Sequence, residues 1–128
     1  MSKSLLTVAV LLGLAAVSAQ ADDAADLKRG KLLYIQCRAC HDLQPEAVQK
    51  VGPNLNGIVG RKSASVEDFA YSPALLKANL VFDKATLDRW IEKPSAVVPG
   101  NAMAFAGVPA AEDRAALIKY IEKESVKR

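Results

Sequence analysis

The first hydrophobic feature of the chain is an unbroken run of small and aliphatic residues, Leu5–Val17. Lys3 precedes it, and Ala19-Gln20-Ala21 follows it with the small-x-small form of a signal-peptidase site. A helix needs about 20 apolar residues to cross a bilayer, and this run is shorter. We therefore predict that residues 1–21 are a cleaved export leader, with a leader retained as an anchor as the alternative.

Beyond this leader the pattern predicts helices at both ends of the remaining chain. The first starts in the acidic segment 22–26, continues with Leu27, Tyr34 and Ile35 at helical intervals, and runs into the cysteines. The last, residues 110–123, has its apolar residues spaced for one buried stripe, with acids early and lysines late.

Two shorter helices are predicted between them from their boundary residues. One begins at Ser72 as an N-cap, with Pro73 at its first helical position, and ends at Asn79. The other opens on Asp83 and stops before Pro94.

The intervening segments, 42–70 and 95–109, carry several glycines and prolines and lack sustained periodicity, so we predict loops. No convincing strand or repeat is present, and the fold class is all-α with one domain, residues 22–128. Aromatic residues make up only 5% of the chain. Four short helices alone can scarcely build a dense core from this composition, so a large apolar group is expected at its centre.

The candidate chemistry is concentrated in Cys37-Arg38-Ala39-Cys40-His41, which holds every cysteine and the only histidine. A disulfide is the ordinary expectation after export, but so short a loop gains little stability from one. A thioredoxin-like dithiol belongs with a βαβ pattern that the chain lacks. A zinc site needs four ligands, and carboxylates would have to complete it, which leaves zinc a remote alternative. Cys-x-x-Cys-His is the attachment motif of c-type haem, because two thiols on neighbouring turns can bond the two vinyl groups while the imidazole reaches the iron.

A haem iron also needs a sixth ligand. No second histidine exists, and apart from the initiator the only methionine is Met103, in a Pro- and Gly-bearing loop. A single methionine is more often a core filler. This one lies in a constrained loop rather than in an amphipathic stripe, which favours ligation.

These segments resemble the class I cytochromes c of the bacterial type across essentially the whole chain after the leader. The matching stretches are GKLLYIQCRACH, GPNLNGIVGRKSA, YSPALLK, PGNAMAFAG and LIKYI, in the family's order and at similar spacing. The resemblance implies a small cytochrome c fold wrapped around one haem c. Cys37 and Cys40 would form the thioethers, His41 would be the proximal ligand and Met103 the distal one.

The same resemblance assigns further residues to the haem surroundings. Pro53 matches the residue whose carbonyl accepts the proximal imidazole N–H, and Arg61 and Tyr71 match positions that hold a haem propionate. Trp90 stands where many members carry a tyrosine near the methionine sulfur. Phe82 stands where many members carry a tryptophan that bonds a propionate, and a phenylalanine side chain cannot donate a hydrogen bond.

The resemblance also concerns the scaffold and the docking face. Gly30 and Tyr34, with Leu117 and Tyr120, match the crossing of the two terminal helices. Neutral residues stand near Met103 where mitochondrial relatives place docking lysines. These residues are Ser95, Ala96 and Ala102.

The expected function is one-electron transport in the periplasm without substrate chemistry, because His/Met ligation leaves no open position on the iron. Expected partners are redox proteins that dock transiently: an oxidase, a cytochrome complex, a reaction centre or a periplasmic dehydrogenase. The formal net charge of +3, without a block of like charge, does not favour a nucleic-acid partner. A haem subunit of an oxidoreductase complex is the alternative, and a peroxidase-like or gas-sensing haem protein is a weaker one.

Overall fold

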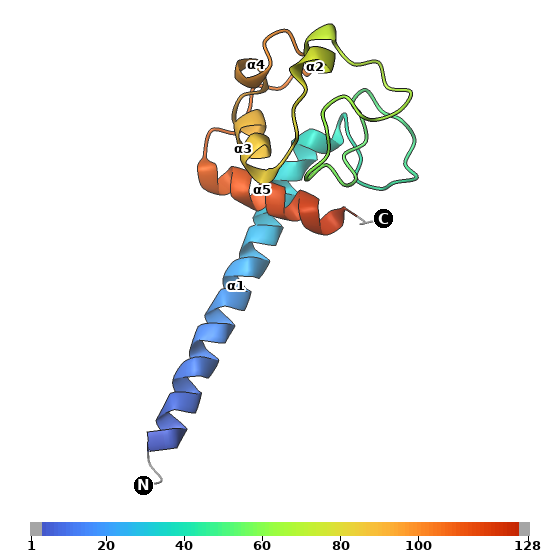
Figure 1. The fold of residues 1–128 in the computed structure, drawn as a ribbon. Helices are drawn as coiled ribbons and strands as arrows, with labels where there is room; N and C mark the ends of the chain where they lie inside the picture. Colours follow the sequence, from blue (N-terminus) through green and yellow to red (C-terminus); the bar gives the residue numbers. More distant parts are fainter. Residues whose placement is uncertain (1–3, 126–128) are drawn as a thin grey trace.

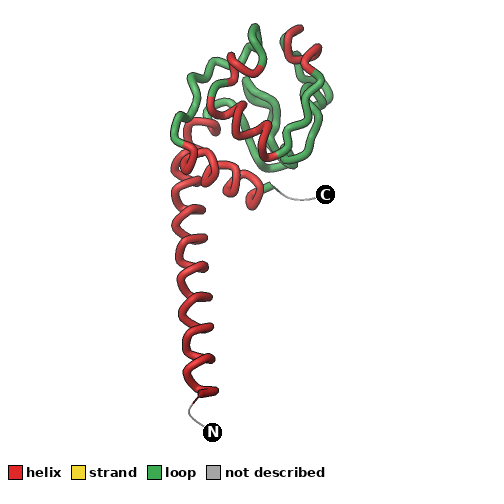
Figure 2. The backbone as a smooth tube through the Cα atoms, turned by 60° about the vertical axis from the view of Figure 1, so that its left-hand side comes forward, coloured by secondary structure: helices red, strands yellow, loops and turns green. Residues whose placement is uncertain are grey.

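The computed structural model describes the backbone of residues 4–125 and the side chains of residues 20–125, so Lys3 of the expected leader lies outside the described residues. Helices and long loops make up the fold, and no strand occurs among these residues (Figures 1 and 2). A single isolated bridge pairs Lys62 with Val81. The helices are α1 (Ser4–Arg38), α2 (Pro73–Ala78), α3 (Lys84–Glu92), α4 (Pro94–Val97) and α5 (Ala111–Glu124). The prediction of an all-α fold is confirmed.

Helix α1 is longer than the sequence pattern predicted. It passes through Asp22 without a break, although we expected the helix to start in segment 22–26. Leucine and alanine, which dominate the preceding run, are strong helix formers and allow the helix to continue toward the N-terminus. No helix within the described part of the chain has both the length and the apolar character to cross a membrane.

The caps predicted for the two middle helices are confirmed. The Ser72 hydroxyl accepts a hydrogen bond from the Leu75 amide at 3.2 Å, and Asn79 ends α2 with a φ of 48°. The Asp83 carboxylate accepts from the Thr86 amide at 2.7 Å at the start of α3. Side-chain capping of unpaired helix amides thus sets these boundaries, as their residue types indicated.

The prediction that segment 95–109 is loop throughout is wrong at its first residues. Pro94 starts the one-turn helix α4, which ends at Val97. Proline suits the first position of a helix because its φ is already helical and its missing N–H is not needed there. The last helix, α5, begins one residue later than predicted, and no side chain caps its N-terminus.

The most extensive contact between helices is the crossing of α1 and α5, at the end of the domain where α1 enters it (Figure 1). Gly30 lies directly against the α5 backbone, so that a β-carbon there would stand 2.2 Å from the carbonyl oxygen of Ala116. Tyr34 and Tyr120 pack beside this contact with ring centroids 5.5 Å apart, and Leu117 is completely buried. Glycine is the residue that permits this approach.

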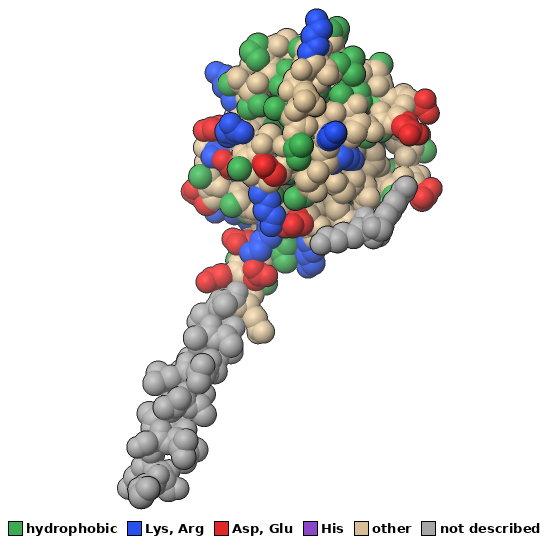
Figure 3. Space-filling model, viewed as in Figure 1, with side chains coloured by type: hydrophobic (Ala, Val, Ile, Leu, Met, Phe, Trp, Pro, Cys, Tyr) green, Lys and Arg blue, Asp and Glu red, His purple; other side chains and the backbone are tan. Residues whose placement is uncertain are grey.

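Ion pairs surround the crossing, and Figure 3 shows the mixed acidic and basic side chains in this region. Lys119 of α5 pairs with Asp23 and, at 3.0 Å, with Asp26, while Arg29 of α1 pairs with Asp113. These are partly exposed pairs, which contribute little stability individually. They link the part of α1 between Asp23 and Arg29 to α5.

The apolar core extends from the crossing to α3 and the loops. Its buried members come from both terminal helices, from α3 and from the loops on either side of it. They are Tyr34, Leu43, Ile58, Phe82, Leu87, Trp90, Ile91, Val98, Val108, Leu117, Ile118 and Ile121. Met103, Cys37 and Leu55 are half-buried against this cluster, so the core reaches the residues with candidate chemistry.

Candidate haem-binding site

The motif Cys37 to His41 lies where α1 ends. The amides of Cys40 and His41 both donate to the carbonyl of Cys37, at 3.1 and 2.9 Å, which closes the last turn. Both cysteines are half-buried free thiols, and no disulfide joins them. Burial raises the pKa of the Cys37 thiol to about 11. A redox dithiol has a lowered pKa instead, so this environment does not favour the thioredoxin-like alternative.

The His41 imidazole is buried and held in one orientation. Its Nδ1 lies 2.7 Å from the carbonyl oxygen of Pro53, to which the neutral ring donates its N–H. Gly52 closes over the ring, because a β-carbon there would stand 2.4 Å from Cε1. Burial lowers the pKa of His41, against the opposing effect of the Pro53 carbonyl. The ring is therefore neutral, and Nε2, which has no hydrogen bond to a described residue, keeps a free lone pair for a metal.

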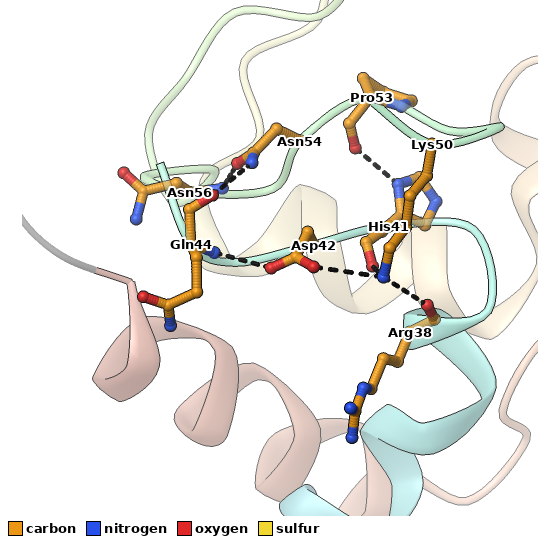
Figure 4. Close-up of polar contacts among 8 residues, drawn as sticks. All are labelled: Arg38, His41, Asp42, Gln44, Lys50, Pro53, Asn54 and Asn56. Atoms are coloured by element: carbon orange, nitrogen blue, oxygen red, sulfur yellow. Dashed lines mark hydrogen bonds and ion pairs between the residues drawn. The ribbon is translucent and has the colours of Figure 1, made fainter. Parts of the chain in front are cut away.

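A lysine that the sequence analysis did not identify locks the turn around His41 (Figure 4). Lys50 Nζ donates to the carbonyls of Arg38 and His41 at 3.0 and 3.2 Å and pairs with Asp42 at 3.2 Å. The Gln44 amide and Lys50 lower the pKa of Asp42. No local pattern marks Lys50, because it lies nine residues after the histidine and acts only through the folded loop.

Two asparagines hold the returning loop against this turn. Asn56 Nδ2 donates to the Leu43 carbonyl at 2.8 Å, and Asn54 Nδ2 donates to the Gln44 carbonyl at 2.7 Å (Figure 4 labels both asparagines). Asn54 also accepts from the Asn56 amide at 2.7 Å. These side chains replace regular secondary structure in satisfying the loop's backbone groups. The two asparagines of the motif GPNLNG are the sequence signal for this arrangement, in addition to the proline that the family resemblance assigns.

The two residues assigned to a propionate by resemblance both bind the loop backbone. Arg61 donates to the carbonyls of Asn56 and Asn54, each at 2.8 Å, and burial lowers its pKa. The Tyr71 hydroxyl accepts from the Val66 amide at 3.1 Å. Both keep capacity for a carboxylate, since a guanidinium has five N–H donors and an accepting hydroxyl can still donate its proton.

Trp90 and Phe82, the two aromatic departures from the family pattern, pack together in the core. Their ring centroids lie 5.4 Å apart in an edge-to-face arrangement, and both side chains are buried. Phe82 also continues the backbone pairing of the loops, since its amide donates to the Arg61 carbonyl at 2.9 Å. Both rings therefore form part of the apolar wall.

Met103 lies in a loop with fixed ends. Asn101 donates from its side chain to the Val98 carbonyl and accepts from the Met103 amide, both at 2.9 Å. At the far end, Gly107 lies against α3, because a β-carbon there would stand 1.9 Å from the Glu92 carbonyl oxygen. The prolines and glycines of this segment predict a constrained loop, whereas no sequence pattern identified Asn101 as the residue that holds it.

Arg114 anchors the same loop to α5. Its buried guanidinium donates to the carbonyls of Val108 and Pro109 at 3.1 and 2.7 Å and to both oxygens of Asp88 at 2.8 and 3.3 Å. Asp88 and burial act in opposite directions on this group, and the hydrogen bonds to Asp88 raise the pKa of Arg114. The arginine thereby joins α5, α3 and the end of the methionine loop.

These residues fit a covalently attached haem. The chain supplies two free thiols and an oriented neutral imidazole at one helix end, a thioether on a constrained loop, and apolar walls that include Phe82. The absence of a side chain at Gly52 leaves space for the His41 imidazole, which a β-carbon there would contact too closely. No group of three or more His, Cys, Asp or Glu side chains that could hold a bare metal ion occurs among the described residues. The fold and site together define a small helical protein that carries haem c.

Comparison with known proteins identifies its family. The chain is 42% identical over 104 residues to cytochrome c2 from Rhodomicrobium vannielii, which covers 81% of this chain and 83% of that protein. It is 37% identical over 122 residues to cytochrome c-554 from Methylosinus trichosporium, covering 95% and 92%. Among solved structures, cytochrome cH from Methylobacterium extorquens matches with a TM-score of 0.70 and 33% identity, over 75% of this chain and 96% of that one. No family model matches.

The chain belongs to the class I cytochrome c family, as the resemblance indicated. It is an electron-transfer protein with haem c as its cofactor, and not an enzyme.

Proposed function

We propose that this protein is an exported one-electron carrier whose haem is bound through thioethers at Cys37 and Cys40, with His41 and Met103 as axial ligands. The observation that carries this proposal is the buried, neutral His41 ring, held by Pro53 next to two free thiols. Met103 supplies the second ligand from a loop that Asn101 holds at its start and that α3 and α5 hold at its far end.

The side chains determine how such a carrier works. The bound haem supplies the reversible one-electron couple of its iron. Pro53 holds the His41 ring in one tautomer and raises its basicity, and Asn101 holds the backbone of Met103. Arg61 and Tyr71 would bind a haem propionate with the donors that their bonds to the loop backbone leave free. With His41 and Met103 both bound to the iron, the chain would leave no site for a substrate, and the same two ligands would serve both oxidation states.

Absorption spectra of the purified protein in both oxidation states test this ligation. We expect a c-type spectrum and the weak long-wavelength band that reports thioether binding to ferric iron. Met103→Leu keeps an apolar side chain and should abolish this band. Val97→Ala removes part of another half-buried side chain packed against the core, and should keep it. A c-type spectrum in which Met103→Leu leaves the band unchanged would exclude Met103 as the ligand.

Reaction with carbon monoxide distinguishes the carrier from a gas-binding or peroxidase-like protein. The reduced parent protein should bind carbon monoxide slowly or not at all, because Met103 occupies the position. Met103→Ala should bind it rapidly. Rapid binding by the parent would favour the alternatives.

We further propose that residues 1–21 are removed on export, so that the working protein is the domain 22–128 in the periplasm. The apolar run followed by Ala19-Gln20-Ala21 supports this. The intact mass of protein recovered from a periplasmic extract should correspond to a chain starting at Asp22. A mass that includes the leader, in the membrane fraction, would favour an anchored carrier.

The proposed partners are redox proteins that bind transiently: an oxidase, a cytochrome complex, a reaction centre or a periplasmic dehydrogenase. Redox encounters bury little surface, generally less than about 1,200 Å². A purified monomer is the expected result. Copurification with one oxidoreductase in fixed ratio would instead support the role of a bound haem subunit.

A further inference from the structure

A groove lies between α1 and the C-terminal end of α5, closed on one side by segment 42–44. Its volume is about 620 Å³. From α1 it is lined by Lys28, Lys31, Leu32, Ile35 and Arg38, and α5 contributes Tyr120 and Glu124. None of the four proposed haem attachment and axial residues lines it. We call it the α1–α5 groove.

The floor of the groove is more apolar than an exposed helix face requires. Leu32 and Ile35 are 62% and 63% exposed, although most large aliphatic residues of the domain are buried or half-buried. They lie three residues apart on α1 and are therefore neighbours on one face. Two adjacent exposed aliphatic side chains within a groove are typical of a surface that a partner covers.

Cations surround this apolar floor. Lys28, Lys31 and Arg38 form no ion pair with a described residue, whereas Arg29 on the same helix pairs with α5. Of the two acids that line the groove, Asp42 is neutralised by Lys50. Glu124 is the one carboxylate lining the groove that forms no ion pair with a described residue. The groove therefore carries a net positive charge, complementary to an acidic protein surface.

The groove is also close to the attachment site along the chain. Ile35 and Arg38 flank Cys37 on the last two turns of α1, and Asp42 follows His41 directly. On the methionine side of the domain, the positions where mitochondrial relatives place docking lysines carry the neutral residues Ser95, Ala96 and Ala102. Charge steering therefore favours the helix side of the haem attachment over the methionine side.

We propose that the α1–α5 groove is the docking surface for a redox partner with an acidic rim and an apolar centre. Leu32 and Ile35 make the apolar contact, and Lys28, Lys31 and Arg38 steer the encounter. This inference rests on the proposed electron-carrier function and specifies the face that the carrier uses. Redox encounters are transient, bury little surface and are steered by complementary charge, which a small apolar floor with surrounding cations can supply.

Paramagnetic mapping on the reduced holoprotein tests where an anion collects. The probe is hexacyanochromate(III), a trivalent anion that broadens nearby amide signals without exchanging electrons. We expect broadening of the amides of residues 28–38 at low salt. Broadening confined to residues 95–105, or spread evenly over the surface, would overturn the proposal.

Charge reversal gives a kinetic test with ferricyanide as the anionic oxidant. Lys28→Glu combined with Lys31→Glu should slow oxidation about tenfold at low ionic strength, with the difference disappearing at high salt. The control pair, Lys62→Glu with Lys93→Glu, makes the same change in net charge at exposed lysines that do not line the groove. Equal or greater slowing by the control pair would refute the groove as the docking face.

The absorption spectrum separates the two levels of inference. If the groove variants keep the parent spectrum and potential but react at the parent rate, the docking surface is wrong and the electron carrier stands. If the parent itself lacks a c-type spectrum, the proposed function fails, and the docking surface fails with it.

Discussion

Replacing Gly30 with alanine sets two effects of opposite sign against each other at the α1–α5 crossing. Alanine favours a helix over glycine by about 1 kcal/mol, which would stabilise α1. A β-carbon at this position would, however, stand 2.2 Å from the carbonyl oxygen of Ala116 and 2.7 Å from Cβ of Tyr120. Such contacts are not tolerated below 3.0 Å, and the first is with backbone, so the two helices must move apart.

The distance by which the two helices move apart determines how much stability is lost. A radial gap of roughly 0.5–1 Å forfeits a quarter to a half of the attractive energy of the facing atoms, and the atoms concerned include the fully buried Leu117. Overpacked sites lose about 1–3 kcal/mol. Because the closest contact is with backbone, the loss should lie near the upper end of this range. After a gain in helix propensity of about 1 kcal/mol, we expect Gly30→Ala to lower the free energy of unfolding by about 2 kcal/mol.

Equilibrium unfolding of the holoprotein in guanidinium chloride, followed by the fluorescence of Trp90, measures this change. The midpoint should fall while the slope stays constant. Gln36→Ala and Gln36→Gly, at an exposed position of the same helix, calibrate the propensity effect. If Gly30→Ala unfolds at the same or a higher denaturant concentration than the parent, propensity outweighs packing and the close approach of the helices is not required.

Four further predictions concern single groups. Tyr34→Phe should raise the free energy of unfolding by about 1 kcal/mol in the same assay, because the buried Tyr34 hydroxyl has no partner among the described residues. Burial also raises the pKa of Tyr34, so that the phenol ionises first in the unfolded chain and the folded state loses stability above about pH 10. The variant, which has no phenol at this position, should lose less stability over this range. A parent and variant of equal stability would contradict this. Gly52→Ala should displace the His41 ring from its carbonyl acceptor and raise the reduction potential, as measured by redox titration; an unchanged potential would mean that the loop absorbs the 2.4 Å contact. Asn101→Ala should cause loss of the thioether band at a lower pH than in the parent, and Asn101→Asp, which keeps the acceptor for the methionine amide, should have the smaller effect; the reverse order would reject the capping role. A backbone amide of α3 lowers the pKa of Asp83, so the contribution of its carboxylate to the free energy of unfolding is complete above the unfolded pKa of 3.8 and is lost as the pH falls through the lower folded pKa. In Asp83→Asn the urea midpoint should therefore depend less on pH over this acidic range. Equal acid sensitivity in parent and variant would disprove this role.

The helices could be predicted because their boundaries are encoded locally. Ser72 and Asp83 each cap the amide three residues ahead, and Pro94 cannot continue the helix that precedes it. These signals act over one turn of chain and need no tertiary contact. The start of α1 was not predicted, because leucine and alanine in the expected leader continue the helix toward the N-terminus while the acidic segment offers no barrier to it.

The site likewise has residues that local sequence predicts and residues that it does not. The motif of Cys37, Cys40 and His41 is contiguous, so its residues could be found from sequence. Lys50 and Arg114 could not, because their hydrogen bonds go to backbone carbonyls that only the folded chain brings near them. Every residue carries a backbone carbonyl, so no pattern of residue types predicts which side chain will donate to it.

The two proposed axial ligands are fixed in different ways but to a common element. His41 follows α1, whose position against α5 is set by the close approach at Gly30. Met103 lies on a loop whose far end Arg114 of α5 holds through two backbone carbonyls. Helix α5 is therefore the reference for both ligands, and a change that moves α5 alters their relative position. A change at Asn101 disturbs one ligand alone, so Gly30→Ala should perturb the ligand field and the stability together, whereas Asn101→Ala should affect mainly the ligand field.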